Sequence, residues 1–182
     1  MQEVFQHLGC LDAPMGIYFV YGNHDRQADS SDHTFTDAEL VAAIEENGIT
    51  ILEDDAKLIG GELLLIGRAD AAWNKSTSRK SISELIQLGQ EDLFLLTLDH
   101  QPLEATENAS AGVDLMLSGH THAGQIFPVG YLMEWSGGLN YSLYQIGNCQ
   151  SIVSSGFAGW GYGIRTQEHC EYVIIDIFSL YQ

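Results

Sequence analysis

The order of apolar and polar positions along the chain predicts an alternation of strands and helices. Short and almost wholly apolar runs of β-forming residues are typical of buried strands. Such runs occupy residues 17–21, 49–52, 63–66, 94–98, 113–117, 151–154 and 172–177. Apolar residues recur at helical spacing in residues 1–10, 36–47 and 81–88. We therefore expect at least seven strands and three helices.

Two of these helices carry sequence signals for where they begin. Thr36 and Glu39 have the spacing of a capping box, and so do Ser81 and Glu84. In this motif the hydroxyl and the carboxylate each satisfy a backbone N–H group of the first turn. The helices should begin directly after Thr36 and Ser81.

The distribution of these elements favours one fold class. Strands and helices alternate through the first two thirds, and strands with glycine-rich loops fill the remainder. This order predicts an α/β core with a more antiparallel C-terminal part. Neither a repeat nor a linker divides the chain, so we expect one domain over residues 1–182. The longest loops are expected at 69–80 and 136–144.

Charge narrows the function classes. Seven Lys and Arg against 25 Asp and Glu give a net charge of −18, while 45% hydrophobic residues suffice for a core. Such a surface repels phosphate backbones, which argues against nucleic-acid binding through a basic patch. An apolar stretch of about 20 residues, long enough to span a bilayer, does not occur. Three widely spaced cysteines indicate neither a disulfide framework nor a metal clip.

Three polar clusters each begin where an apolar strand is predicted to end. They are Gly22-Asn23-His24-Asp25, Asp99-His100-Gln101-Pro102 and Gly119-His120-Thr121-His122. Open α/β sheets bind their ligands at the carboxyl ends of strands. The three clusters therefore predict one shared site. Imidazole nitrogens mixed with Asn and Asp oxygens suit a transition metal better than Ca²⁺ or Mg²⁺ alone.

Individual histidines allow further predictions. In a His-x-His pair on extended backbone the two rings point to opposite faces. His120 and His122 must therefore share an ion across a bend or serve two ions. Asp25 could hold the neighbouring His24 ring in one tautomer and raise its pKa, which would prepare a proton donor. The remaining histidines, His7, His33 and His169, are expected on the surface.

Other readings are weaker. The glycine-aromatic segment 155–163 matches neither common phosphate-loop spacing. Its Trp160 and Tyr162 either line a leaving-group pocket or pack in the core, which is the commoner role. The chain has no G-x-S-x-G of a serine hydrolase. An amidohydrolase would carry His-x-His on the first strand of a barrel of about 250 residues, whereas here the pair lies two thirds along a shorter chain.

The three clusters, with the extended run Gly119-His120-Thr121-His122-Ala123-Gly124-Gln125, resemble the last three motifs of the calcineurin-like metallophosphoesterases in order and spacing. The segments around 152–156 and 163–165 resemble the bacterial branch of UDP-2,3-diacylglucosamine hydrolase-like phosphoesterases. The resemblance runs from about residue 14 to 177. It implies a metallophosphoesterase-like β-sandwich flanked by helices, in the order α/β/β/α.

The resemblance also implies a ligand set and a reaction. Asn23, His100 and His120 would hold the second metal and His122 the first. His24, oriented by Asp25, would be the general acid, and a metal-bound hydroxide would attack phosphorus. The metals would be divalent Mn, Fe or Zn, two in the intact family.

The resemblance implies less about the substrate and the cellular location. The substrate would be a small phosphoester or a lipid-linked one. Arg165 would contact the phosphate or form a structural salt bridge. Localisation is left open, since a segment upstream of Met1 could associate with a membrane.

Two earlier family motifs, Asp-x-His and Gly-Asp-x-x-Asp, do not occur in the chain. We therefore expect an incomplete domain that lacks its first strands, with His122 left alone for the first metal. The alternative to an active enzyme is a catalytically impaired remnant that binds one metal or none. Unpaired sheet edges would favour a homo-oligomer that covers them.

Overall fold

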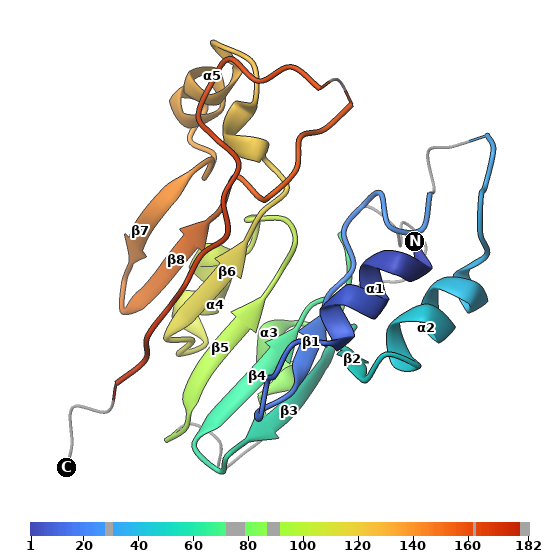
Figure 1. Ribbon diagram of the computed structural model, residues 1–182. Helices are drawn as coiled ribbons and strands as arrows, with labels where there is room; N and C mark the ends of the chain where they lie inside the picture. The colour runs from blue at the N-terminus through green and yellow to red at the C-terminus, as the bar shows by residue number, and fades with distance from the viewer. Residues whose placement is uncertain (28–30, 72–78, 87–91, 162, 179–182) are drawn as a thin grey trace.

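Two β-sheets of unequal size organise the chain (Figure 1). The computed structural model describes residues 1–27, 31–71, 79–86, 92–161 and 163–178. The smaller sheet pairs β1 (Ile17–Phe19) with β2 (Ile49–Ile51) in parallel. The larger sheet holds β3 (Asp55–Ile59), β4 (Leu63–Gly67), β5 (Phe94–Leu98), β6 (Leu115–Ser118), β7 (Ser142–Ile146) and β8 (Cys149–Val153).

The larger sheet has the order β3-β4-β5-β6-β8-β7. Its four inner strands are parallel, and β3 and β7 pair antiparallel at the two edges. The predicted α/β core is confirmed. Because the inner strands are parallel, their carboxyl ends lie along one edge of the sheet.

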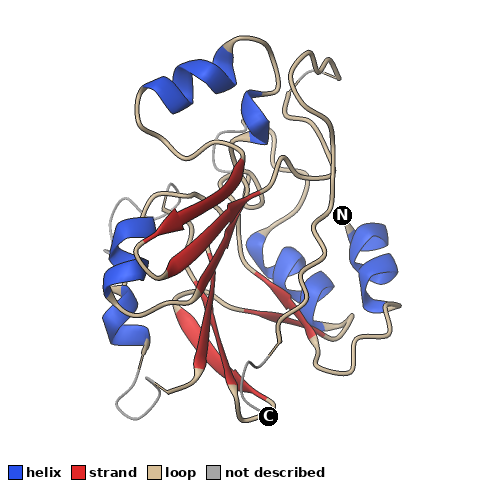
Figure 2. Cartoon of the chain, turned by 90° about the vertical axis from the view of Figure 1, so that its left-hand side faces the viewer, coloured by secondary structure: helices blue, strands red, loops and turns tan. Residues whose placement is uncertain are grey.

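Four of the helices that the structure describes lie on the outer faces of the sheets, and α5 (Val129–Trp135) lies beyond the end of the larger sheet, as Figure 1 and Figure 2 show. The four are α1 (Gln2–Gly9), α2 (Asp37–Glu45), α3 (Ile82–Leu85) and α4 (Ala105–Ser110), and a short 3₁₀ turn lies at His122–Gly124. In one core α3 and α4 pack against Leu64, Leu95 and Met116 of the larger sheet. In a second core α1 and α2 pack against β1 and β2. This is the helix–sheet–sheet–helix order that the resemblance implies.

Both predicted capping boxes are present. Glu39 N donates to Thr36 Oγ1 at 3.2 Å, and Thr36 N donates to the Glu39 carboxylate at 2.8 Å. Ser81 and Glu84 form the same pair of bonds. The two helices begin where the sequence predicts, although α3 ends at Leu85. The predicted continuation past residue 86 lies outside the described residues.

Gly67 at the end of β4 brings the two sheets together. A Cβ at this position would overlap the Cβ of Leu52 and lie 3.0 Å from a methyl carbon of Val20. Only glycine lets the backbone of β4 approach the smaller sheet so closely. This contact places the loop after β1 beside the loops after β5 and β6.

Several predicted elements are wrong. Residues 172–177 form no strand, because no strand among the described residues pairs with them, and Tyr172 and Ile174 are largely exposed. An apolar run fits a strand pattern, but a strand also needs a partner. The strand β7 begins inside the loop expected at 136–144. The edge strand β3 was missed because its outward residues, such as Asp55 and Lys57, are polar.

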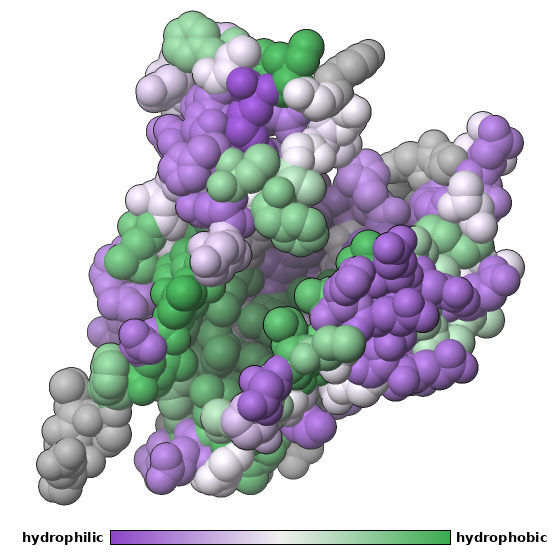
Figure 3. All heavy atoms as spheres, in the orientation of Figure 1, coloured by the Kyte–Doolittle hydropathy of each residue, from purple (hydrophilic) through white to green (hydrophobic). Residues whose placement is uncertain are grey.

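The second face of the larger sheet is only partly covered. Alternate residues of β5 and β6, such as Leu96, Leu98 and Leu117, point away from α3 and α4 and are half-buried. Figure 3 shows an apolar hollow at this part of the molecule. The apolar surface of the sheet is thus larger than the described elements cover.

Candidate metal centre

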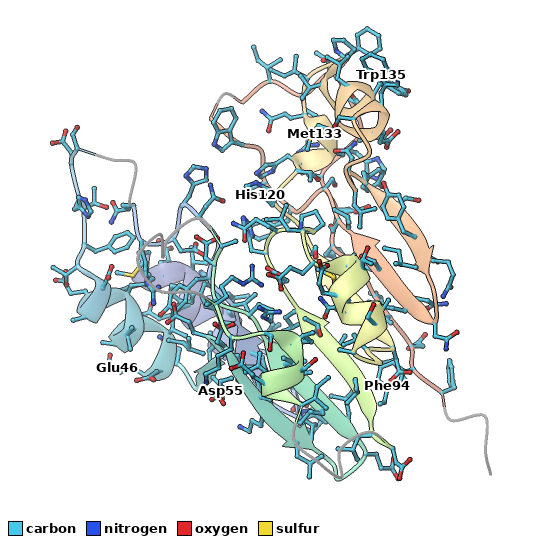
Figure 4. All side chains as sticks on the ribbon, turned by 180° about the vertical axis from the view of Figure 1, so that it is seen from behind. Glu46, Asp55, Phe94, His120, Met133 and Trp135 are labelled. Atoms are coloured by element: carbon cyan, nitrogen blue, oxygen red, sulfur yellow. The ribbon has the colours of Figure 1, made fainter. Side chains whose placement is uncertain are left out.

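Three loops meet at the carboxyl ends of the strands. The loop after β1 carries Asn23, the loop after β5 carries His100, and the loop after β6 carries His120. Strands β5 and β6 are parallel neighbours, and the Gly119 amide donates to the His100 carbonyl at 3.1 Å. Figure 4 shows His120 between the sheets and the α5 region. The structure brings these three residues together, as the strand ends predict; their role as a metal site stays a prediction.

The side chains of Asn23, His100 and His120 converge on one point. Oδ1 of Asn23 lies 3.0 Å from Nε2 of His100 and 3.1 Å from Nδ1 of His120. The two ring nitrogens are 3.2 Å apart. Three ligands held at right angles, each about 2.1 Å from one ion, would be about 3.0 Å from one another. The triangle therefore has the size of one face of an octahedral metal site.

Hydrogen bonds within the triangle cannot satisfy all three atoms. The Asn23 oxygen only accepts hydrogen bonds. Its contact with His100 therefore requires a hydrogen on Nε2 of His100, and its contact with His120 requires one on Nδ1 of His120. Hydrogens on both nitrogens would bring two N–H groups together at 3.2 Å. With only one hydrogen, one edge joins two lone pairs. A cation in front of the triangle can accept all three lone pairs, so the donor set fits a divalent transition metal.

The protonation of the two imidazoles agrees with this role. Burial, together with the charge of His120, lowers the pKa of His100 to about 4. Burial also lowers the pKa of His120, against the opposing charge of Asp70. Because a metal binds the neutral imidazole, both rings have their lone pairs available at neutral pH.

Gly22 makes room for the His100 ring. A Cβ on Gly22 would lie 2.7 Å from Cε1 and 2.9 Å from Nδ1 of His100. The first residue of the Gly22–Asp25 cluster therefore serves the ligand that follows β5. The sequence places glycine where a ring from a distant segment must lie.

The turn that carries His120 has an unusual backbone. His120, His122, Ala123 and Gln125 all have positive φ, between 46° and 68°. Such non-glycine residues are uncommon and cluster at functional sites. The bend expected between His120 and His122 is present, but it does not bring both rings to one point. The Nδ1 atom of His122 lies 3.3 Å from the Ala158 carbonyl oxygen.

His24 and Asp25 lie beside the cluster with partners other than each other. Nε2 of His24 accepts from the Trp160 indole at 3.0 Å and lies 3.1 Å from Nδ2 of Asn23. Oδ2 of Asp25 accepts from the Gly22 amide at 2.5 Å. Burial raises the pKa of the Asp25 carboxyl. The roles of His24 as general acid and of Asp25 as its partner stay predictions.

Arg165 donates hydrogen bonds to the backbone of the turn that carries His122. Its Nη1 donates to the His122 carbonyl at 2.8 Å and its Nη2 to the Ala158 carbonyl at 3.4 Å, while its Nε is buried without a hydrogen bond. These bonds hold two backbone segments. The phosphate contact proposed for Arg165 stays a prediction.

A cavity of about 410 Å³ opens beside the cluster. It is lined by Asn23, His24, His120, Thr121, His122, Gly124, Gln125, Ile126, Val129 and Trp160. Trp160 lines this cavity and is 56% exposed, so its expected position in the core is wrong, and the role of the cavity as a leaving-group pocket stays a prediction. Tyr162 lies outside the described residues.

Sequence reasoning missed a polar network behind His100. Gln101 donates to the buried Asp70 carboxylate and accepts from the Ala71 amide at 3.2 Å. Arg79 bonds to Asp99 at 2.6 Å, although burial still raises the pKa of Asp99 to about 6. The signal was available, because Asp70 also follows an apolar strand end.

The described residues contain no group of three His, Cys, Asp or Glu that could hold a metal. The candidate centre depends on the amide oxygen of Asn23 as its third donor. In the part of the chain that the structure describes, the helices are too short to cross a bilayer.

Fold and site together define a mixed α/β protein with a nitrogen and oxygen donor cluster at the carboxyl edge of its sheets. No family model matches the chain. An uncharacterized metallophosphoesterase of Helicobacter pylori is 30% identical over 161 residues, 87% of this chain and 41% of that protein. One of Campylobacter jejuni is 40% identical over 83 residues, 45% of this chain and 22% of that protein.

A solved crystal structure has a TM-score of 0.52 and 14% identity, and the match covers 83% of this chain and 61% of that one, which shows a shared fold. Over most of its length the chain is similar to proteins named metallophosphoesterases. It spans about two fifths of the length of the Helicobacter relative.

Proposed function

We propose that this chain carries a metal centre for phosphoester hydrolysis, with Asn23, His100 and His120 as ligands. The observation that supports it is the triangle of their donor atoms, with edges of 3.0, 3.1 and 3.2 Å. Similarity to proteins named metallophosphoesterases supports the reaction class. Mn, Fe or Zn would suit these nitrogen and oxygen donors.

A bound ion would act as a Lewis acid toward the phosphoryl oxygens. Water supplies the oxygen that joins phosphorus, and the bond from phosphorus to the leaving oxygen breaks. We propose that His24, at the wall of the cavity, is the general acid: it passes to that leaving oxygen the proton that the attacking water gives up, so that the ring is neutral before and after the step. Nε2 of His24 accepts from the Trp160 indole and faces the NH₂ group of Asn23, so the hydrogen of the neutral ring is on Nδ1.

One ion per chain is the proposed stoichiometry. The ring of His122 lies against the Ala158 carbonyl and brings no second ligand group with it. A protein site that holds a catalytic metal generally supplies about three ligands. His122 alone therefore makes a weak second site at most.

Hydrolysis of bis(p-nitrophenyl) phosphate with Mn²⁺ tests the proposed reaction. We expect turnover that EDTA removes and that His120→Ala reduces at least a hundredfold, because one of three ligands is lost. His7→Ala is the matched control, since His7 is exposed on α1, away from the cavity. A protein that binds Mn²⁺ without turnover would instead support the impaired remnant. That alternative is favoured by the absence of a three-residue His, Cys, Asp or Glu group from the described residues.

The cavity wall suggests a substrate with an apolar alcohol, such as a lipid-linked phosphoester. Ile126, Val129 and Trp160 line one side, and the net charge of −18 offers no general attraction for a polyanion. Inhibition by alkyl phosphates of increasing chain length tests this. We expect tighter inhibition with longer chains, whereas equal inhibition at all lengths would contradict it.

Self-association is a further proposal, supported by the half-buried leucines on the second face of the larger sheet. Burying apolar area favours a dimer that covers this face. Sedimentation equilibrium should give a mass that rises with protein concentration toward twice 20.0 kDa. A constant monomer mass up to high concentration would exclude it.

A further inference from the structure

The side chain of Asn23 faces two groups with its two different atoms. Its oxygen points to His100 and His120, and its Nδ2 lies 3.1 Å from Nε2 of His24. An amide turned by half a rotation would occupy nearly the same space, because oxygen and NH₂ are similar in size. The turned amide would aim hydrogens at the cluster and remove one metal ligand. The orientation of Asn23 therefore depends on what Nε2 of His24 can do.

Trp160 decides whether this nitrogen accepts or donates. An indole N–H can only donate, and Nε1 of Trp160 lies 3.0 Å from Nε2 of His24. Nε2 must therefore accept, and the hydrogen of the neutral ring is on Nδ1. Because Nε2 of His24 carries a lone pair, it favours the orientation of Asn23 in which the NH₂ group, and not the oxygen, faces His24. The opposite tautomer would set two N–H groups against each other and would attract the Asn23 oxygen away from the cluster.

Gln125 holds Trp160 in place. Its Nε2 donates to the Trp160 carbonyl at 2.8 Å, and its Oε1 accepts from the Trp160 amide at 2.6 Å. The same Nε2 donates to the Ile164 carbonyl at 3.1 Å, and the Gln125 side chain is buried. The rings of Trp160 and His24 stack with centroids 6.4 Å apart and 29° between their planes. The loop of Trp160 is thus tied to the same turn that carries His120.

We propose that Trp160 is a positioning residue of the metal centre: its indole N–H fixes the tautomer of His24, and this tautomer keeps the Asn23 oxygen turned toward the metal. The inference rests on the proposed metal site and extends it outward by two residues. Partners that orient metal ligands are typically worth ten- to a hundredfold in metal affinity. We expect a loss of about tenfold when the indole donor is removed, at the low end of that range because Asn23 is one of three ligands.

Trp160→Phe tests the proposal, because it removes the donor and keeps an aromatic ring. Trp135→Phe is the matched control, since Trp135 is 87% exposed on α5 and points outward in Figure 4. Mn²⁺ affinity is measured by titration calorimetry, and the His24 tautomer by ¹⁵N NMR of the metal-free protein. We expect Nε2 of His24 to be unprotonated in the wild type, a tautomer mixture and about tenfold weaker Mn²⁺ binding in Trp160→Phe, and no change in Trp135→Phe.

The outcomes separate the two proposals. A wild type that binds no Mn²⁺ overturns the metal site itself and this inference with it. A wild type that binds Mn²⁺, with Trp160→Phe binding equally well and showing the same tautomer, overturns only the role of Trp160. The tautomer in the wild type is a test without any variant: a hydrogen on Nε2 of His24 contradicts the proposal even if Trp160→Phe fails to fold.

Discussion

At the scale of single residues, the candidate site depends on residues that are far apart in the sequence and close together in the fold. Asn23 and His100 are separated by 77 positions, and their donor atoms are 3.0 Å apart. Gly22 and Gly67 contribute no side chain, yet each permits a close approach that a methyl group would block. The proposed centre therefore depends on these glycines as well as on the side chains that would bind the metal.

Gly22→Ala should weaken metal binding by at least tenfold. The added Cβ would lie 2.7 Å from the His100 ring, and the ring must move out of the triangle to relieve this overlap. Titration calorimetry with Mn²⁺ measures the effect. Gly119→Ala is the matched control, because it also adjoins a ligand but a Cβ there meets no atom within 4 Å. Equal losses in both variants would contradict the explanation.

His100 should remain neutral well below the pH at which histidines usually titrate. Burial lowers its pKa to about 4, so falling pH charges the ring only near that value. NMR titration of the metal-free protein, with the resonance assigned by His100→Gln, reports the midpoint. A midpoint near the ordinary value of 6.5 would show that the ring is more exposed than the structure describes.

At the scale of elements, the sequence predicted the parts whose signals are local. Both capping boxes and the runs that became β1, β4, β5 and β8 depend on neighbouring residues, so pattern alone located them. The strand expected at 172–177 is wrong because pairing depends on a distant partner. The clusters after β1, β5 and β6 were expected to meet because each follows the end of a strand, and the structure brings Asn23, His100 and His120 together. The partners of His24 and Arg165 could not be predicted, since Trp160 and Ala158 lie on a loop without a regular pattern.

The cap of α2 gives a quantitative test at this scale. Thr36→Ala removes the hydroxyl that accepts from the Glu39 amide and should lower the free energy of unfolding by about 1 kcal/mol. Thr36→Ser keeps the hydroxyl and should lose much less. Urea denaturation of the three proteins measures both values. Equal losses for Ala and Ser would show that the methyl group matters and the cap does not.

At the scale of the whole molecule, both the net charge and the fold favour a bound cation where the two sheets meet. A chain with a net charge of −18 has little general attraction for a phosphate ester, and a bound cation would offset that at one place. The two sheets meet where Gly67 approaches Leu52, and the donor triangle lies across the loops that this contact brings together. The proposed metal centre therefore needs residues from both sheets of the fold.

An anomalous difference map from a crystal of the Mn²⁺-loaded protein tests the central claim most directly. The account predicts one peak per chain, at about 2.2 Å from Oδ1 of Asn23, Nε2 of His100 and Nδ1 of His120. A well-ordered map with no peak in front of this triangle, or with the ion held by other residues, would contradict it.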